Sequence, residues 1–265
     1  MLRWIKHAGA GHTGGGLSCI DILNVLYNRI LRVSPETLAD PGRDRYIQSK
    51  GHCVEALYVV LADRGFFPEE KLQTLCQYDS PFVGHPTRAV PGIEHNTGAL
   101  GHGLSVSVGA AIAGKKDRRD FRVYVLMGDG ELAEGSNWEA AMAAAHYSLD
   151  NLIAIVDHNT LQISGRTRDV CSNEPLDEKF RAFGWHVQSV DGHNFNELTA
   201  AFAPSDQIRK PRVVIANTVK GKGINFMQDV AKWHHGVPDA AEYAAAMRDL
   251  DDAMVHLART IGAAK

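Results

Sequence analysis

Apolar runs alternate with amphipathic stretches along most of this chain. Runs rich in β-branched and aromatic residues predict buried strands at Arg45–Ser49, Phe121–Met127, Asn151–Asp157, Trp185–Asp191 and Arg212–Val219. Strands that alternate with helices are typical of an α/β fold. We therefore expect a doubly wound, mostly parallel sheet with helices on both faces. We find no internal repeat and no linker, which favours a single domain over residues 1–265.

Local signals place several helices. Leu2–Ala8 reads as the end of a helix, and its shortness leads us to expect either a truncated helix or a true start upstream. Ser18 with Asp21 can cap a helix, and Pro68 can open another, PEEKLQTLC. Further helices are expected over His52–Phe66, Asn96–Gly114, Glu134–Leu149 and Asn194–Ala203. An amphipathic helix should close the chain after a long loop, Val219–Pro238.

Polar side chains follow two of the predicted strands. Asp129 lies between two glycines directly after Phe121–Met127, and Asn159 follows Asn151–Asp157. Ligands of open α/β sheets bind at the carboxyl ends of the strands. One carboxylate, one amide oxygen and open backbone carbonyls suit Mg²⁺ held jointly with phosphates. The alternative interpretation is that Asp129 and Asn159 are ordinary turn residues.

Composition and charge exclude several classes of protein. With 45% hydrophobic residues, the 265-residue chain can bury a full core. Its net charge of −3 gives no sign of a nucleic-acid partner. No apolar run approaches the roughly 20 residues of a membrane span, and the first twelve residues lack the apolar core of a signal peptide. The four cysteines form no CxxC pattern, which favours reduced thiols in a cytoplasmic protein.

The chain holds thirteen histidines, and several adjoin a glycine in predicted loops. Imidazole can donate, accept or relay protons near neutral pH. We expect such groups around a small polyhydroxylated substrate, and the candidates are His12, His52, His85 and His235. Surface or capping roles are expected for His7, His146, His158, His186 and His193. The run GAGHTG (Gly9–Gly14) matches G-x-G-x-x-G, but a helical segment precedes it, so we do not interpret it as a dinucleotide site.

Five separated blocks resemble the transketolase family: GHTGGGLS, SKGH, GHP…NTGALG, the stretch from GDG to Asn159, and VKGKG…WHHG. The segment GDGELAEGSNWEAAMAAAHYSLDNLIAIVDHNTLQISG is similar to the thiamine-diphosphate motif of that family. The resemblance covers essentially the whole chain and implies the family's diphosphate-binding domain. It also implies that Mg²⁺ is bound by Asp129, the Asn159 side chain and the backbone carbonyl of Leu161.

The same resemblance implies roles for further residues. Contacts to the diphosphate are implied for His52 and His235, and contacts to the ketose for His12, His85 and His235. The residues implied to line the cofactor are Gly98, Leu100, Gly128, Gly130 and Ile163. Glu134 and Glu139 resemble positions at a subunit interface near the cofactor ring, although acids that favour the helix macrodipole are an equal alternative. Where the family usually has Gln and Glu, this chain has His102 and Thr87, and the role of His102 stays open.

The implied activity is transfer of a two-carbon ketol unit from a ketose, expected to be phosphorylated, to an aldose through thiamine diphosphate and Mg²⁺. Because the diphosphate-binding domain accounts for the whole chain, the resemblance implies a second polypeptide, the C-terminal transketolase subunit with the pyrimidine-binding domain. We expect a heterotetramer with two copies of each chain. The small-residue helices Gly98–Gly114 and Ser136–Ala145 would pack against the other subunit. Two alternatives are a fragment of the deoxyxylulose-phosphate-synthase type and a non-catalytic assembly or regulatory partner that keeps the fold.

Overall fold

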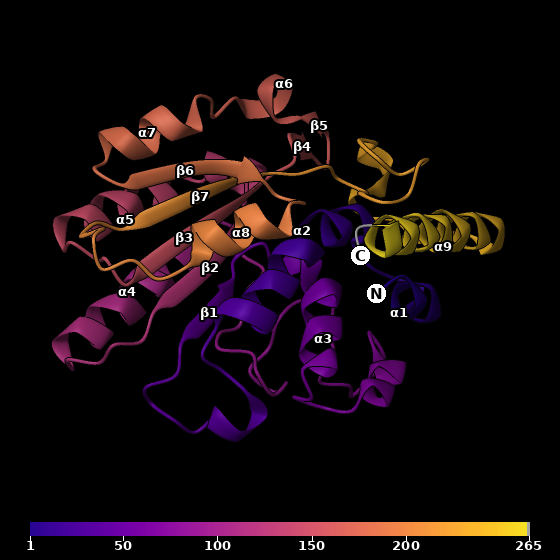
Figure 1. The fold of residues 1–265 in the computed structure, drawn as a ribbon, viewed down its shortest axis with the longest axis horizontal. Coiled ribbons are helices and arrows are strands. Elements are labelled where there is room, and N and C mark those ends of the chain that lie inside the picture. The colour runs from indigo at the N-terminus through magenta and orange to yellow at the C-terminus, as the bar shows by residue number, and fades with distance from the viewer. Residues whose placement is uncertain (264–265) are drawn as a thin grey trace.

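A parallel sheet forms the centre of the molecule (Figure 1). The computed structural model describes residues 1–263, with side chains for residues 1–259. The strands are β1 (Arg45–Gln48), β2 (Val123–Gly128), β3 (Leu152–His158), β6 (His186–Asp191) and β7 (Arg212–Asn217). They lie in the order β1-β2-β3-β7-β6, and every neighbouring pair is parallel. Each of the predicted apolar runs therefore forms a strand of one sheet.

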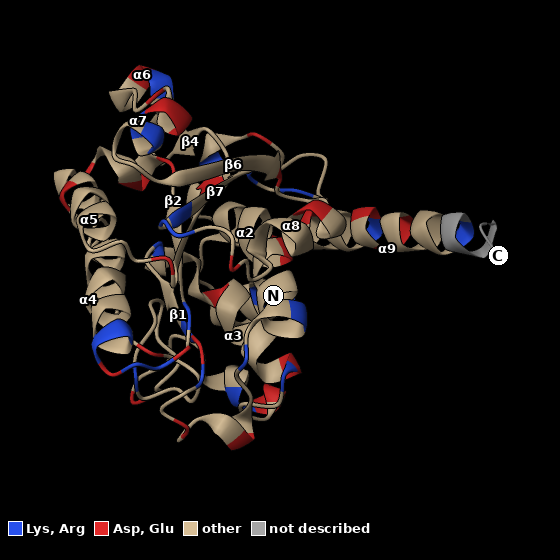
Figure 2. Cartoon of the chain, turned by 60° about the vertical axis from the view of Figure 1, so that its left-hand side comes forward, with Lys and Arg blue, Asp and Glu red and all other residues tan. Residues whose placement is uncertain are grey.

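Helices cover both faces of this sheet (Figure 2). One layer consists of α2 (Thr13–Val25), α3 (Val54–Asp63) and α8 (Phe195–Phe202), and the other of α4 (Gly103–Lys116), α5 (Gly135–His146) and α7 (Leu176–Ala182). Successive strand residues point to opposite faces, so Tyr124 and Leu126 pack in the first layer and Val123 and Val125 in the second. Strands buried on both faces are apolar throughout. The expected doubly wound architecture is confirmed.

The glycine-rich segment after α1 (Leu2–Ala8) is helical, which corrects the predicted helix start. Helix α2 begins at Thr13 and not at Ser18. A Cβ on Gly15 would lie 2.6 Å from Cys53 Sγ, so glycine serves close packing within a helix here. Ser18 lies inside α2, where its hydroxyl donates to the Gly15 carbonyl and to Asp157. Tertiary packing of the glycines at the start of this helix has overridden the local capping signal.

Two other segments differ from the expectations. The stretch after Pro68 forms a 3₁₀ helix over Glu69–Thr74 and not an α-helix through Cys76. Cys76 has φ 58°, outside helical geometry, and its N–H donates to the Phe82 carbonyl. The expected helix Asn96–Gly114 begins at Gly103, since Gly98 and Gly101 have φ values of 144° and 84° that an α-helix does not accommodate.

The segment after β3 adds elements that the apolar pattern did not reveal. It holds a two-stranded hairpin, β4 (Leu161–Gln162) with β5 (Gly165–Arg166), and a short helix, α6 (Thr167–Cys171). The long loop before the last helix contains a 3₁₀ turn, Ala231–His234, and α9 (Ala240–Ala263) is the final element. Within residues 1–263, none of the helices combines the length and apolar character that a membrane crossing requires.

Candidate active site

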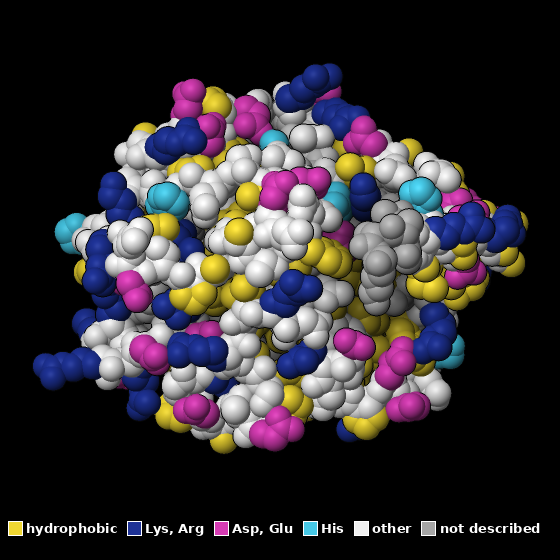
Figure 3. All heavy atoms as spheres, viewed as in Figure 1, with side chains coloured by type: hydrophobic (Ala, Val, Ile, Leu, Met, Phe, Trp, Pro, Cys, Tyr) yellow, Lys and Arg dark blue, Asp and Glu magenta, His cyan; other side chains and the backbone are white. Residues whose placement is uncertain are grey.

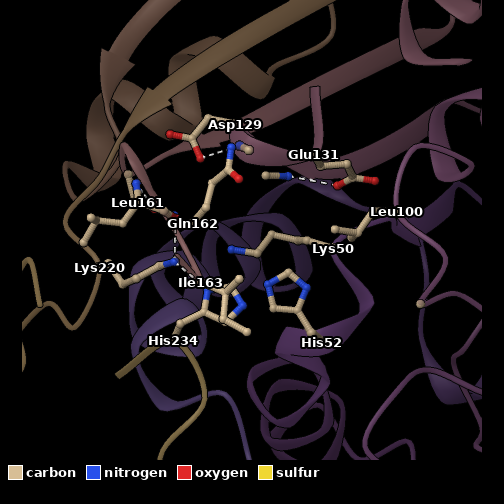
Figure 4. A pocket seen from close by; sticks show the side chains of 14 residues that line it. Lys50, His52, Leu100, Asp129, Glu131, Leu161, Gln162, Ile163, Lys220 and His234 are labelled. Atoms are coloured by element: carbon tan, nitrogen blue, oxygen red, sulfur yellow. Dashed lines mark hydrogen bonds between the residues drawn. The ribbon is translucent and has the colours of Figure 1, made fainter. Parts of the chain in front are cut away.

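A cavity of about 310 Å³ lies at the carboxyl ends of β1, β2 and β3 (Figure 4). Parallel strands bring the loops that follow them to the same edge of a sheet. Lys50 and His52 follow β1, residues 128–131 end β2 and begin the next loop, and Asn159 follows β3. The lining is completed by Gly98, Leu100, Leu161, Gln162, Ile163, Lys220 and His234.

Most residues predicted to bind the cofactor or the metal line this cavity. They are His52, Gly98, Leu100, Gly128, Asp129, Gly130, Asn159, Leu161 and Ile163. At Gly98 the backbone has φ 144°, and a Cβ there would lie 2.9 Å from the ring of His85. Only glycine fits that position without strain. The structure brings these residues together, while their individual binding roles stay predictions.

Glu134 and Glu139 lie outside the lining of the cavity. Glu134 is exposed at the start of α5, against the backbone of Gly101, where an added Cβ would lie 2.5 Å from the Glu134 Cβ. Glu139 is exposed one turn later on α5. Their predicted place at a subunit interface stays a prediction.

Five histidines from four segments form a cluster at the cavity. The ring centre of His12 lies 4.6 Å from that of His235, 5.2 Å from that of His52 and 6.4 Å from that of His85. His234 stacks on His52 with ring centres 5.2 Å apart. The four predicted loop histidines therefore converge on one place, and His234 joins them.

Lowered pKa values keep three histidines of this cluster neutral at pH 7. Desolvation is the main cause for each. It lowers the pKa of His12 to about 4, and the neighbouring imidazoles add to the effect. Burial likewise lowers the pKa of His234 to about 3, with a further contribution from Lys220, and lowers the pKa of His85. A neutral imidazole donates one hydrogen bond and accepts another. That state suits the binding of hydroxyl groups and the transfer of their protons.

His234, rather than its neighbour His235, faces the cavity. Lys220 Nζ lies 3.0 Å from His234 Nδ1. His235 is exposed and packs against His12. His235 was predicted because Gly236 follows it, but a neighbouring glycine does not distinguish two adjacent imidazoles. His234 is thus an additional candidate for the diphosphate contact that was predicted for His235.

Hydrogen bonds hold the predicted metal ligands on the loops after β2 and β3. Asp129 Oδ2 accepts a hydrogen bond from the Thr160 N–H at 2.5 Å. Asn159 Oδ1 accepts one from the Leu161 N–H at 3.1 Å. The carbonyl of Leu161 accepts one from Lys220 Nζ at 2.6 Å. The three predicted metal ligands therefore lie in one continuous group of hydrogen-bonded residues.

The chemistry of this set fits a hard divalent cation. Asp129 is 4% exposed and pairs with no cationic side chain in the part of the chain that the structure describes. Burial, with the nearby Asp157, raises the pKa of the Asp129 carboxyl. A cation would offset that penalty, and amide and carbonyl oxygens are also ligands for Mg²⁺. Among the described residues, no three His, Cys, Asp or Glu side chains form a metal-binding group, so the site would rely on amide, carbonyl and phosphate oxygens.

A buried ion pair next to the cavity was not identified from the sequence. Lys50 and Asp157 are 2% and 0% exposed, and Lys50 Nζ binds Asp157 Oδ2. Asp157 also accepts hydrogen bonds from the hydroxyls of Ser18 and Thr218. Burial alone would raise the pKa of Asp157, but Lys50 and these hydroxyls lower it. The sequence feature that could have revealed the pair is Asp157, a carboxylate at the end of an otherwise apolar predicted strand.

Glu131, Gln162 and Lys220 also line the cavity without having been predicted. Glu131 is buried and accepts hydrogen bonds from the N–H groups of Gly101, at 2.9 Å, and Gly128, at 3.0 Å. It thereby holds two glycine-containing loops together. Burial lowers the pKa of Lys220 to about 8. Lys220 belongs to the VKGKG block, and Glu131 and Gln162 lie within the segment from GDG to LQISG, but nothing in these blocks singled the three residues out.

Comparison with known proteins identifies the fold and the family. Residues 2–251 match the family model described as transketolase, thiamine diphosphate binding domain. The chain is 51% identical over 253 residues to an apulose-4-phosphate transketolase subunit of Phocaeicola vulgatus, covering 95% of this chain and 90% of that protein. It is 42% identical over 252 residues to a 6-deoxy-6-sulfo-D-fructose transketolase subunit of a Clostridium species, covering 94% of this chain and 92% of that protein.

A solved transketolase from Campylobacter jejuni has the same fold, with a TM-score of 0.84 and 32% identity over 94% of this chain. The chain spans 40% of the length of that transketolase. The matches with subunits of similar length confirm the resemblance seen in the sequence blocks. The chain belongs to the transketolase family, in which it forms the thiamine-diphosphate-binding domain.

Proposed function

We propose that this chain is the thiamine-diphosphate-binding subunit of a two-subunit transketolase. With its partner it transfers a two-carbon ketol unit from a ketose to an aldose, using thiamine diphosphate and Mg²⁺. The observation that carries this proposal is the cavity, where hard oxygen donors on two strand-end loops adjoin a cluster of neutral histidines. The two relatives described above bear the word subunit in their names.

In this proposal the diphosphate end of the cofactor lies in the cavity. Asp129, Asn159 and the Leu161 carbonyl would hold Mg²⁺, and Lys220, which donates to that carbonyl, would be released from it to pair with the phosphates. His52 and His234 offer imidazole N–H groups to phosphate oxygens. Thiamine diphosphate, when bound, supplies the nucleophilic carbon and the electron sink for cleaving a carbon–carbon bond.

The histidine cluster would handle the protons of the sugar. His12 and His85 have lowered pKa values, chiefly through burial, so both are neutral at pH 7. A neutral imidazole can accept the proton of a hydroxyl that becomes a carbonyl and can return it to the acceptor sugar. His235, exposed beside His12, is the third proposed member.

The proposed partner is the C-terminal transketolase subunit with the pyrimidine-binding domain, in a heterotetramer of two copies of each chain. One face of α4 supports such a contact. Ser105, Gly109 and Ala113 recur every four residues on this face and are exposed, and a Cβ on Gly109 would meet no atom within 4 Å. The opposite face of α4 packs against the hydrophobic core of this chain. A single domain and a cytoplasmic location complete the proposal.

The proposed donor is a ketose with an anionic group at its far end, such as apulose 4-phosphate. The names of the two relatives give a phosphate and a sulfonate in that place. The buried ammonium groups of the cavity have other assigned partners, since Lys50 pairs with Asp157 and Lys220 is assigned to the phosphates of the cofactor. We therefore assign recognition of the distal anion to residues of the partner.

The test is a ketol-transfer assay with this chain, the partner, and both together. Each sample contains thiamine diphosphate, Mg²⁺, apulose 4-phosphate and an aldose acceptor. Turnover is expected only when both chains are present. Robust turnover by this chain alone would contradict the proposal, and Mg²⁺-dependent cofactor binding without turnover of any ketose would favour a non-catalytic role.

A further inference from the structure

Helix α9 has two halves with different surroundings. In the first half, Ala246 is fully buried, and Tyr243 and Leu250 pack against a small apolar cluster of the body. That cluster contains Leu2, Leu17, Ile224, Met227 and Trp233. The side chain of Asp249 also accepts hydrogen bonds from the backbone and side chain of Asn225. The first half of α9 is therefore fixed to the molecule.

The second half extends away from the body into solvent (Figure 2). Every residue from 251 to 259 is exposed. Met254 is 68% exposed and Leu257 is 58% exposed. Large apolar side chains on a projecting helix are costly to leave in water, and a helix segment this short is only marginally stable without packing.

One apolar stripe runs through both halves, and we call it the α9 stripe. Tyr243, Leu250 and Leu257 are spaced by seven residues, and Met247 and Met254 follow the first two of them by four. This alternation of four and three is the pattern by which a helix buries one seam against another helix. Tyr243 and Leu250 of the stripe pack against the body, and no other described residue covers the stripe beyond Leu250.

The exposed half lies outside the cofactor-binding domain. The family match ends at residue 251, which is where α9 leaves the body. The cavity and the histidine cluster lie at the carboxyl edge of the sheet, and no residue of the exposed half lines them. The exposed part of the stripe therefore needs a role other than holding the cofactor.

We infer that the exposed part of the α9 stripe docks onto the partner chain, through a complementary apolar helix or groove. The inference rests on the proposed function, which requires a second polypeptide. Relatives of similar length are themselves named as subunits, so a partner chain is the occupant that the comparisons support. Packing Met254 and Leu257 against that partner would bury the side chains that the isolated chain leaves in water.

Two adjacent residues provide a matched test. Met254 lies on the stripe, whereas Val255, 50% exposed, lies about 100° further round the helix. Met254→Glu and Val255→Glu introduce the same charge one residue apart and remove a similar exposed apolar group. Circular dichroism on both variants checks that the helix content is unchanged. Leu257→Glu is the second variant on the stripe.

The measurement is calorimetric titration of the purified partner into each variant, with ketol transfer assayed in parallel. We expect Met254→Glu and Leu257→Glu each to weaken association by about tenfold or more, the effect of losing a buried interface side chain, and Val255→Glu to stay within a few-fold of wild type. If the wild-type pair is active and all three variants bind the partner with equal affinity, the docking inference is wrong. An inactive wild-type pair would instead count against the proposed function.

A second copy of this chain is the other possible occupant. Sedimentation of the isolated chain distinguishes it. If the wild-type chain self-associates and Met254→Glu abolishes that association without changing the affinity for the partner, the stripe is a homodimer contact and our assignment is wrong.

Discussion

The two edges of the same sheet carry charged side chains in opposite ways. At the carboxyl edge, Lys50, Asp129 and Asp157 are buried beside the cavity. At the amino edge, a second cavity of about 380 Å³ is lined by six cationic and three acidic side chains, and four of the cations are exposed. The exposed cations are Lys115, Arg118, Arg119 and Arg209. Lysine and arginine side chains gather on this side of the molecule (Figure 3). Counted by charge alone, the amino edge would be the more conspicuous site.

The carboxyl edge differs from the amino edge because it contains a buried charged side chain that has no ion-pair partner among the described residues. The Lys115–Asp150 pair at the amino edge has side chains 39% and 26% exposed, so water screens both charges. Arg212, the buried cation there, donates to the carbonyl of Ala203 at the end of α8. Asp129, in contrast, is buried with no cationic partner among the described residues. Such a carboxylate costs free energy unless a ligand compensates it, which is the mark of a binding site.

The largest expected difference between the edges concerns the cofactor. Asp129→Ala should abolish Mg²⁺-dependent binding of thiamine diphosphate, because it removes the one carboxylate of the proposed metal site. The fold should persist, since the substitution also removes a buried carboxylate that has no cationic partner among the described residues. Calorimetric titration measures the affinity, and Asp206→Ala, an exposed carboxylate at the amino edge, is the matched control. Unchanged affinity in Asp129→Ala would refute the metal assignment.

The next effect concerns catalysis in the complete enzyme. His85→Ala and His235→Ala should each lower kcat/KM by about 10²–10⁴-fold, the usual contribution of a positioned proton-transfer group. Their melting temperatures should remain close to that of wild type. His186→Ala, at the start of β6 on the amino edge, serves as the control and should leave the kinetics unchanged. If the cluster variants retain activity within a few-fold, the cluster is structural.

Stability should separate two ion pairs of the same type. Lys50→Met leaves Asp157 buried and unpaired, so the free energy of unfolding should fall by about 3–5 kcal/mol. Lys115→Met breaks a solvent-screened pair and should cost at most about 1 kcal/mol. Urea denaturation of both variants measures the difference. Equal losses would mean that burial at the carboxyl edge has no energetic consequence.

The smallest expected effect is a change in pH dependence. The pKa of His12 is lowered to about 4 by burial, below the value of about 6.5 in an unfolded chain. The unfolded state then binds more protons between those values, so the free energy of unfolding should decrease as the pH falls from about 6.5 toward 4. His12→Asn should flatten this slope, whereas His146→Asn, exposed on α5, should not. Parallel slopes for both variants would contradict the buried, neutral state of His12.

The strands, and the meeting of Asp129 and Asn159 at one edge of the sheet, could be predicted because their signals are local. The runs ending before Asp129 and Asn159 are apolar throughout, and a parallel sheet places both residues at one edge. The loop histidines were found because glycines beside them mark irregular backbone. Both kinds of signal are present in a short stretch of sequence.

The remaining site residues depend on contacts between distant segments. Nothing near Glu131 in the sequence indicates that its carboxylate holds two glycine loops. Lys50 and Asp157 are 107 residues apart, and only the folded sheet makes them a pair. The helix was expected to begin at Ser18, because the close approach of Cys53 that favours Gly15 inside the helix comes from a different segment. Packing decides these features, so a local pattern could not reveal them.

The central claim is that the carboxyl-edge cavity holds Mg²⁺ and the diphosphate of the cofactor. A crystal structure of this chain with its partner, thiamine diphosphate and Mg²⁺ tests it most directly. We predict a metal ion bound by Asp129, the Asn159 side chain and the Leu161 carbonyl, with Lys220 displaced from that carbonyl. A cofactor bound elsewhere, or a metal ion held without Asp129, would contradict the account.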